Sequence, residues 1–209
     1  MRTSGTVLLA AAALVASTAA MAATVTIPGD RVFPESMSAS ADGALYFGSI
    51  GEGAIFRAAP GAAGATLFVR PNAKLRSVTG VLADDASGTL WLCSSPSPLR
   101  NPPAVGTASL MAFDLKTGAR EGAWPFPAPA SACNDITIAR DGTAYATDTP
   151  NGRIFVLKPG AKALELFAAD DRLKGVDGIV FSGDGTLYLN IVSEGQLMRV
   201  DRKAYGSFA

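Results

Sequence analysis

A short phrase that recurs four times is the feature of this sequence that most limits its possible folds. The phrase is an Asp or Ser, then Gly, any residue, Leu or Ala, and Tyr or Trp, and its glycines are Gly43, Gly88, Gly142 and Gly185. Successive glycines are 45, 54 and 43 residues apart, and a proline-rich insertion at residues 95–107 accounts for the long middle step. The chain is therefore built from repeats of about 45 residues.

Each copy of the phrase indicates a hairpin, because an Asp-Gly or Ser-Gly pair separates two short runs of apolar, β-branched and aromatic residues. The third copy predicts four strands, at residues 135–140, 143–147, 153–158 and 164–168. The fourth copy predicts three, at residues 178–182, 186–192 and 196–201. No segment keeps a helical period, so we expect an all-β chain.

Repeats of this length with four strands each are typical of a β-propeller, in which every repeat forms one blade around a central channel. A β-sandwich is the alternative, but it would not need the same phrase to recur with the same flanking pattern. The repeats account for about four blades. Residues 23–27 resemble a lone strand of the kind that pairs with the last blade of a closed ring. We expect residues 23–209 to form an incomplete propeller, shortened at its C-terminus.

The first 22 residues have the pattern of a secretory signal peptide. Arg2 precedes an apolar run at residues 7–16, and Ala20-Met21-Ala22 matches a cleavage site. The run of ten residues is too short to span a bilayer and no stop-transfer segment follows it, although a retained anchoring helix is the alternative. We expect an exported protein, periplasmic or secreted, with no membrane span once the signal is removed.

Composition excludes several classes of function. Lys plus Arg and Asp plus Glu number 18 each, so no net charge favours nucleic acid or an anionic surface. The sequence has no histidine, which removes histidine-based catalysis and most zinc sites. The two cysteines, Cys93 and Cys133, lack a metal-binding spacing; export would permit a disulfide between them, and the sequence leaves that pairing open.

Three repeats place a side chain with a ligand oxygen seven residues before the Asp of the turn, and these are Glu35, Asn134 and Asp177. In a propeller, residues at the same position of each innermost strand are related by rotation about the central axis. The three side chains should therefore converge at one mouth of the channel. An all-oxygen set suits Ca²⁺ best, with Mg²⁺ or Mn²⁺ as alternatives, whereas the simpler interpretation is that such residues often start strands. The same count in the second repeat gives Gly80, which predicts no side-chain ligand from that blade.

The strings around these positions resemble the SMP-30/gluconolactonase (regucalcin-like, luciferin-regenerating-enzyme-like) family. They are FPES before ADGALYFGSI, RSVTG before SGTLWLCSS, CND before RDGTAYATDT and VDG before GDGTLYLN, and the likeness covers most of residues 33–201. The resemblance implies a six-bladed propeller with one catalytic divalent cation in its channel. It also implies that Glu35, Asn134 and Asp177 hold this cation, Ca²⁺ first, with Mg²⁺, Mn²⁺ or Zn²⁺ as alternatives.

The activity that the resemblance implies is hydrolysis of a sugar lactone or related ester. The cation would polarise the carbonyl, while Asp177, which matches the family's general base, would take a proton from the attacking water. Arg76 matches the family's substrate-contacting arginine, although a solvated loop arginine is the simpler interpretation, and the Asn expected two residues later is Val78. The recurring Tyr and Trp are expected to pack between blades, and Asp148 to cap a strand end.

Two other interpretations stay open on the sequence alone. A non-catalytic exported propeller would act as a binding or scaffold module, which Val78 and the shortened ring favour. A fragment with open blade faces and unpaired edges would fold poorly alone or self-associate through those edges. The expected partners are therefore a small-molecule lactone or ester and, through the open edges, a second copy of the chain.

Overall fold

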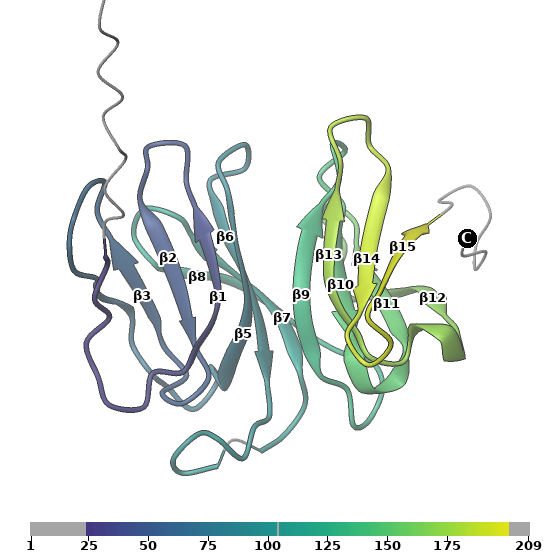
Figure 1. Cartoon of the computed structure of the whole chain (residues 1–209), viewed down its shortest axis with the longest axis horizontal. Helices are drawn as coiled ribbons and strands as arrows, with labels where there is room; N and C mark the ends of the chain where they lie inside the picture. The colour runs from purple at the N-terminus through teal and green to yellow at the C-terminus, as the bar shows by residue number, and fades with distance from the viewer. Residues whose placement is uncertain (1–23, 104, 201–209) are drawn as a thin grey trace, which may run out of the picture.

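The computed structural model describes residues 24–103 and 105–200, and this part of the chain is almost entirely β (Figure 1). Its strands form four antiparallel sheets, three with four strands and the last with three, and each sheet consists of consecutive strands in chain order. The predicted all-β propeller of repeated blades is confirmed. The predicted signal peptide, residues 1–22, lies outside the described residues. In the described part, no helix is both long and apolar enough to cross a membrane.

The blades follow one another along the chain, from purple to yellow in Figure 1. Blade 1 comprises β1 (Pro34–Ala39), β2 (Leu45–Ser49), β3 (Ile55–Ala58) and β4 (Thr66–Val69). Blade 2 comprises β5 (Ser77–Asp84), β6 (Thr89–Ser95), β7 (Ser109–Asp114) and β8 (Arg120–Pro125). Blade 3 comprises β9 (Cys133–Ile138), β10 (Ala144–Asp148), β11 (Arg153–Leu157) and β12 (Glu165–Ala169). Blade 4 comprises β13 (Val176–Phe181), β14 (Leu187–Ile191) and β15 (Gln196–Val200).

The first strands of successive blades pack against one another, β1 on β5, β5 on β9 and β9 on β13. Two short 3-10 helices, η1 (Thr149–Asn151) and η2 (Asp171–Leu173), lie at the ends of blade 3 strands. The hydrophobic core fills the spaces between the blades, with one cluster between each neighbouring pair. This packing aligns the innermost strands, so equivalent residues of different blades meet at the channel.

Tyr46, Trp91 and Tyr145, three of the four recurring aromatic residues, belong to these inter-blade layers as predicted, whereas Tyr188 of blade 4 is in none of the described clusters. Tyr46 packs edge-on against Phe68, with ring centroids 5.6 Å apart, in the cluster between blades 1 and 2. Tyr145 contacts Phe167 at 5.1 Å and Phe181 of blade 4 at 5.3 Å. These rings are buried packing residues rather than a surface for a ligand.

The Asp-Gly turns have a local cause that explains why the phrase recurs. Asp42 Oδ1 accepts a hydrogen bond from the Ala44 N–H at 2.9 Å, and Asp184 Oδ1 accepts one from the Thr186 N–H at the same distance. The glycine between them has a positive φ, 87° at Gly43, which a residue with a Cβ adopts only at a cost. The three Asp-Gly turns, in blades 1, 3 and 4, therefore need this pair of residue types.

The lone strand expected at residues 23–27 is reduced, in the described residues 24–27, to a single bridge that lies on blade 1. Thr26 forms an isolated parallel bridge with Gly64, in which its N–H donates to Ala63 O at 2.9 Å. Val25 and Ile27 pack on the outer face of blade 1. The segment follows blade 1 because that blade offers both an apolar face and free backbone groups close to it in the chain.

A disulfide joins Cys93 of β6 to Cys133 of β9, with their Cα atoms 5.1 Å apart. Both residues are fully buried in the cluster between blades 2 and 3. The pairing that the sequence left open is therefore made, and it ties two neighbouring blades together beside the channel.

Candidate functional site

Each innermost strand carries a β-bulge at the same place, a feature that the sequence analysis missed. The pairing of β1 with β2 is irregular between Pro34 and Met37, because two residues of β1 face one of β2. Equivalent irregularities occur in the pairings of β5, β9 and β13. The first residues of the four bulges are Glu35, Thr79, Asn134 and Asp177, and the second residues are Ser36, Gly80, Asp135 and Gly178.

Thr79, not Gly80, is therefore the blade 2 counterpart of the three predicted ligands. Ala39 pairs with Leu45 across a five-residue turn in blade 1, whereas Ala83 pairs with Leu90 across a six-residue turn in blade 2. Counting back from the turn consequently shifted the predicted position by one residue. Blade 2 does offer an oxygen at this register, but the Thr79 hydroxyl donates to Cys133 O at 2.8 Å.

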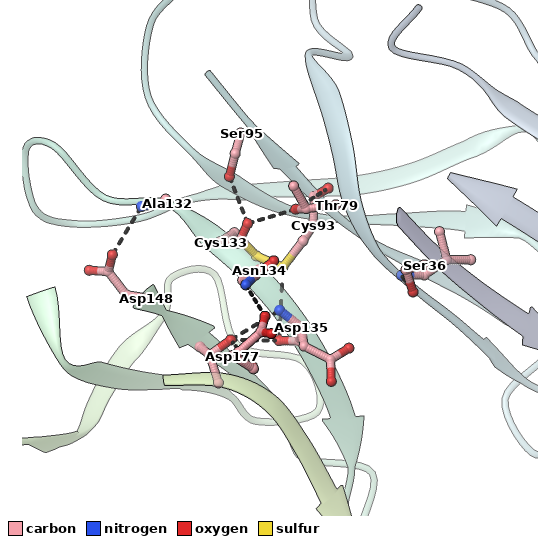
Figure 2. Close-up of a disulfide and its surroundings, with 12 residues drawn as sticks. Ser36, Thr79, Cys93, Ser95, Ala132, Cys133, Asn134, Asp135, Asp148 and Asp177 are labelled. Atoms are coloured by element: carbon pink, nitrogen blue, oxygen red, sulfur yellow. Dashed lines mark hydrogen bonds between the residues drawn. A yellow bond between two sulfur atoms is a disulfide. The ribbon is translucent and has the colours of Figure 1, made fainter. Parts of the chain in front are cut away.

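The structure brings the three predicted metal ligands to one cavity of about 330 Å³. Asn134 and Asp177 are in direct contact, since Asn134 Nδ2 donates a hydrogen bond to Asp177 Oδ1. Figure 2 shows this pair beside Asp135, where β9 approaches the following blade. Glu35 reaches the same cavity from blade 1, and Asn190 of β14 completes its polar wall.

The cavity is strongly acidic. Loss of water at its wall, together with the negative charges of Asp177 and Asp135, raises the pKa of Glu35 to about 7. Burial likewise raises the pKa of Asp135, although the hydrogen bond from the Ile179 N–H opposes this shift. Glu35 as a whole residue remains exposed. A bound cation would relieve the part of its pKa shift that comes from the negative charges of Asp177 and Asp135.

The donor set fits a hard divalent cation. The cavity is lined by carboxylate, amide and hydroxyl groups, and neither a lysine nor an arginine is among its lining residues. Within residues 24–103 and 105–200, no three His, Cys, Asp or Glu side chains lie close enough together to hold one ion by themselves. A cation here would therefore need an amide oxygen of Asn134 or Asn190, and solvent, to complete its ligand shell.

Asp135 is a cavity residue that the sequence analysis did not select. Its Oδ2 accepts the Ile179 N–H of blade 4 at 2.9 Å. In the same way, Ser36 Oγ of blade 1 accepts the Val81 N–H of blade 2 at 3.1 Å. In blades 1 and 3 the side chain of the second bulge residue thus links its blade to the next one. The sequence signal for Asp135 was its place directly after a predicted ligand.

Arg76 is not brought to the acidic cavity. Its Nε donates to Val105 O at 2.7 Å, in the loop between β6 and β7. Val78, at the position where the family resemblance leads one to expect an Asn, is fully buried in the cluster between blades 1 and 2. A contact between Arg76 and a substrate remains a prediction, and it would require this side chain to leave Val105.

Asp148 has a structural role, in line with the simpler interpretation of the sequence. Its side chain is fully buried, and Oδ2 binds the Arg153 guanidinium at 2.7 Å. Its Oδ1 accepts the Ala132 N–H at 2.9 Å (Figure 2). Asp148 therefore fixes the segment that enters β9 and, through it, the position of Asn134.

A second cavity, of about 370 Å³, adjoins the first and shares Asn134 with it. Its wall includes the hydroxyl groups of Thr79, Ser95 and Thr149. Thr79 Oγ1 and Ser95 Oγ both donate to Cys133 O, at 2.8 and 2.7 Å (Figure 2). Thr149 Oγ1 is buried and has no hydrogen-bond partner among the described residues. This uncharged cavity, whose wall also includes the apolar side chains of Ile50 and Pro96, lies where the rest of a ligand held at Asn134 could extend.

Comparison with protein-family models and with curated proteins gives no match. Solved structures do match. A streptogramin B lyase shares 18% identity at a TM-score of 0.66, over 86% of this chain and 54% of its own. Virginiamycin B lyase from Staphylococcus aureus, a catalytically inactive histidine-to-alanine variant with quinupristin, shares 16% identity at a TM-score of 0.68. The match covers 87% of this chain and 56% of the lyase. Hydrazine synthase from Kuenenia stuttgartiensis shares 16% identity at a TM-score of 0.61, and the match covers 82% of this chain and 45% of the synthase.

The chain thus spans about half the length of these neighbours. At such identities the likeness concerns the fold and carries no residue roles with it. Two of these neighbours are named as lyases, and that activity is stated of those proteins alone. What the comparisons establish is that the chain has the β-propeller fold.

Proposed function

We propose that the protein is an exported, divalent-metal-dependent hydrolase of the SMP-30/gluconolactonase type, which opens a sugar lactone or a related ester. One observation carries the proposal. Glu35, Asn134 and Asp177 come from three blades, occupy the same bulge position and line one acidic cavity. Any side chains at this register would converge, so the support for a site is their chemistry: two carboxylates and one amide share the cavity.

The proposed cation is Ca²⁺, with Mg²⁺, Mn²⁺ or Zn²⁺ as alternatives, and Glu35, Asn134 and Asp177 would hold it. When bound, it would supply positive charge to the ester carbonyl and to the oxyanion that develops on it. Burial first, and then repulsion from Asp177 and Asp135, raises the pKa of Glu35. The repulsion supports this assignment, since a cation between these carboxylates would remove it.

Asp177 is the proposed general base. Its Oδ1 accepts the hydrogen bond from the Asn134 amide, which fixes the carboxylate and leaves Oδ2 to take a proton from water. Its backbone is held as well, because the Thr147 hydroxyl donates to Asp177 O at 2.9 Å. The second cavity, on the other side of Asn134, would accept the remainder of the ester through its hydroxyl groups.

A non-catalytic binding module is the second candidate, and the arginine favours it. Arg76 donates to Val105 O, so the acidic cavity has no cationic side chain with which to orient the oxygens of a substrate. The lyase neighbour does not supply a different mechanism, because its inactive variant lacks a histidine and this sequence contains none. In either case we propose that the open ends of the blade series self-associate.

The test is a Ca²⁺ titration followed by thermal melting of the full chain, expressed with its predicted signal peptide. A cation that binds only the folded state raises the Tm, and a concentration of 100 times Kd corresponds to about 2.7 kcal/mol. We expect the rise in wild type and in Asp171→Ala, whose exposed carboxylate lies outside the cavity, but not in Asp177→Ala. A lactone hydrolysis assay then separates the two candidates.

A Tm that no divalent cation moves would refute the metal site. A Ca²⁺-dependent rise without hydrolysis of any lactone or ester would favour the binding module. Hydrolysis that needs the cation and is lost in Asp177→Ala would support the hydrolase.

A further inference from the structure

The last blade leaves uncovered the face that every other blade buries. Ile55, Leu110 and Ile154 occupy equivalent positions on the third strands of blades 1, 2 and 3, and each is fully buried against a neighbouring blade. The equivalent residue of blade 4 is Leu197, which is 73% exposed. Val180 of β13, on the same face, is 57% exposed.

The first blade shows the complementary deficiency. Val81, Ile136 and Ile179 follow the bulges of β5, β9 and β13 by one residue, and each is at most 4% exposed because the preceding blade covers it. Their counterpart in β1 is Met37, which is 66% exposed. Val25 and Ile27 pack with the buried Phe47 and Phe56 on this blade face and leave Met37, the cross-strand partner of Phe47, uncovered.

These two surfaces are the two halves of an ordinary inter-blade contact. We call the face of β13–β15 with Val180 and Leu197 the end face, and the face of blade 1 with Met37 the start face. Within the chain, the face of one blade equivalent to the end face packs on the face of the next blade equivalent to the start face. This contact occurs between blades 1 and 2, 2 and 3, and 3 and 4. A partner for the end face should therefore resemble a start face, and the chain itself supplies one.

Symmetry decides how many copies are needed. The chain matches 54–56% of the length of the propeller lyases, so its four blades correspond to slightly more than half of such a chain. A two-fold axis along the channel would place the end face of each copy on the start face of the other, which makes the same contact twice and leaves neither open. The resulting eight blades lie within the usual range for propellers.

We propose that two copies of this chain close into one eight-bladed ring through these paired faces. The inference deepens the self-association proposed above and rests on the blade faces, not on the hydrolase chemistry. It also affects the candidate site, because Met37 lines the acidic cavity. In the ring, blade 4 of the partner would cover Met37 and close the open side of that cavity.

The experiment is a mass measurement by sedimentation or light scattering on the full chain with its predicted signal peptide removed by export. Wild type should have twice the mass of one chain. Leu197→Asp and Met37→Asp should each raise the dissociation constant of the dimer by more than about 100-fold, because each buries an unpaired carboxylate in both contacts. Leu166→Asp is the matched control, since this β12 leucine is 52% exposed but lies on neither face.

Both test residues are exposed in the single chain, so their variants should keep the wild-type circular dichroism spectrum. A monomeric wild type, an open-ended series of larger species, or a dimer that survives both substitutions would overturn the ring. The Ca²⁺-dependent melting of wild type and Leu197→Asp keeps the two proposals separate, because Leu197, unlike Met37, does not line the acidic cavity. A monomer that binds Ca²⁺ contradicts the ring alone, and a dimer indifferent to divalent cations contradicts the metal site alone.

Discussion

Replacing Gly80 with alanine should push blades 2 and 3 apart at the candidate site. Gly80 is the second bulge residue of β5, and a Cβ built on it would lie 2.4 Å from Asn134 O and 3.1 Å from Asp135 Cα. Ordinary contact begins at 3.4 Å, so the strands would have to separate by about 1 Å. The atoms in the way belong to the backbone, and rotation of a side chain cannot relieve the clash.

The expected cost is that of overpacking a tight interior, about 1–3 kcal/mol. We expect the upper part of this range, because the disulfide between Cys93 and Cys133 joins the same two blades and resists their separation. For a domain of this size each kcal/mol lowers the Tm by about 2–4 °C. Because Asn134 moves with the strand, the rise in Tm on adding Ca²⁺ should also shrink.

The matched control is Gly183→Ala, where a Cβ would meet no atom within 4 Å. Melting curves of both variants and wild type, recorded by circular dichroism with and without Ca²⁺, give the comparison. We expect the control to melt within about a degree or two of wild type, or slightly above it. Should Gly80→Ala melt like Gly183→Ala and respond fully to Ca²⁺, the close approach of the two bulges would not constrain the site.

Two further predictions concern the charge of the cavity and the disulfide. The pKa of Glu35 is raised from 4.5 in the unfolded chain to about 7 in the fold, so the stability it contributes is full below pH 4.5 and is lost as the pH rises to 7. Without divalent cations, the Tm should therefore fall over this range, and Glu35→Gln should flatten the fall; an unchanged pH profile would contradict the assignment. The disulfide closes a loop with a sequence separation of 40, for which chain entropy predicts about 4 kcal/mol of stabilisation. Urea unfolding of Cys93→Ala/Cys133→Ala against wild type measures it, and a difference below about 1 kcal/mol would show that the blades hold together without it.

The repeat made much of the fold predictable because its signals are local. An Asp that accepts the N–H two residues on and a Gly with positive φ fix each hairpin, so the strands followed from the turn positions. For the third repeat, the expected first strand at residues 135–140 corresponds to β9 (Cys133–Ile138). The bounds differ because cross-strand pairing, rather than residue type, ends a strand.

The candidate site was harder to predict because it depends on register and on loops. Glu35, Asn134 and Asp177 could be found by counting, since their three turns have equal length, but the longer turn of blade 2 hid Thr79. A β-bulge has no residue-type signal of its own, so the part played by Asp135 was not visible. The direction of Arg76 is set by a carbonyl in the insertion, and no pattern in the sequence specifies such a contact.

The repeated bulge also bears on how such a site can change over generations. Each bulge offers one side chain at the same end of the channel, so a point mutation in one blade alters the chemistry of the mouth while the backbone of every blade stays as it is. Thr79 is the clearest position for such a change, because an aspartate there would add an acidic group and would lose only the hydrogen bond to Cys133 O. In a protein of repeated blades, the specificity of the site can therefore change by mutation while the scaffold stays the same.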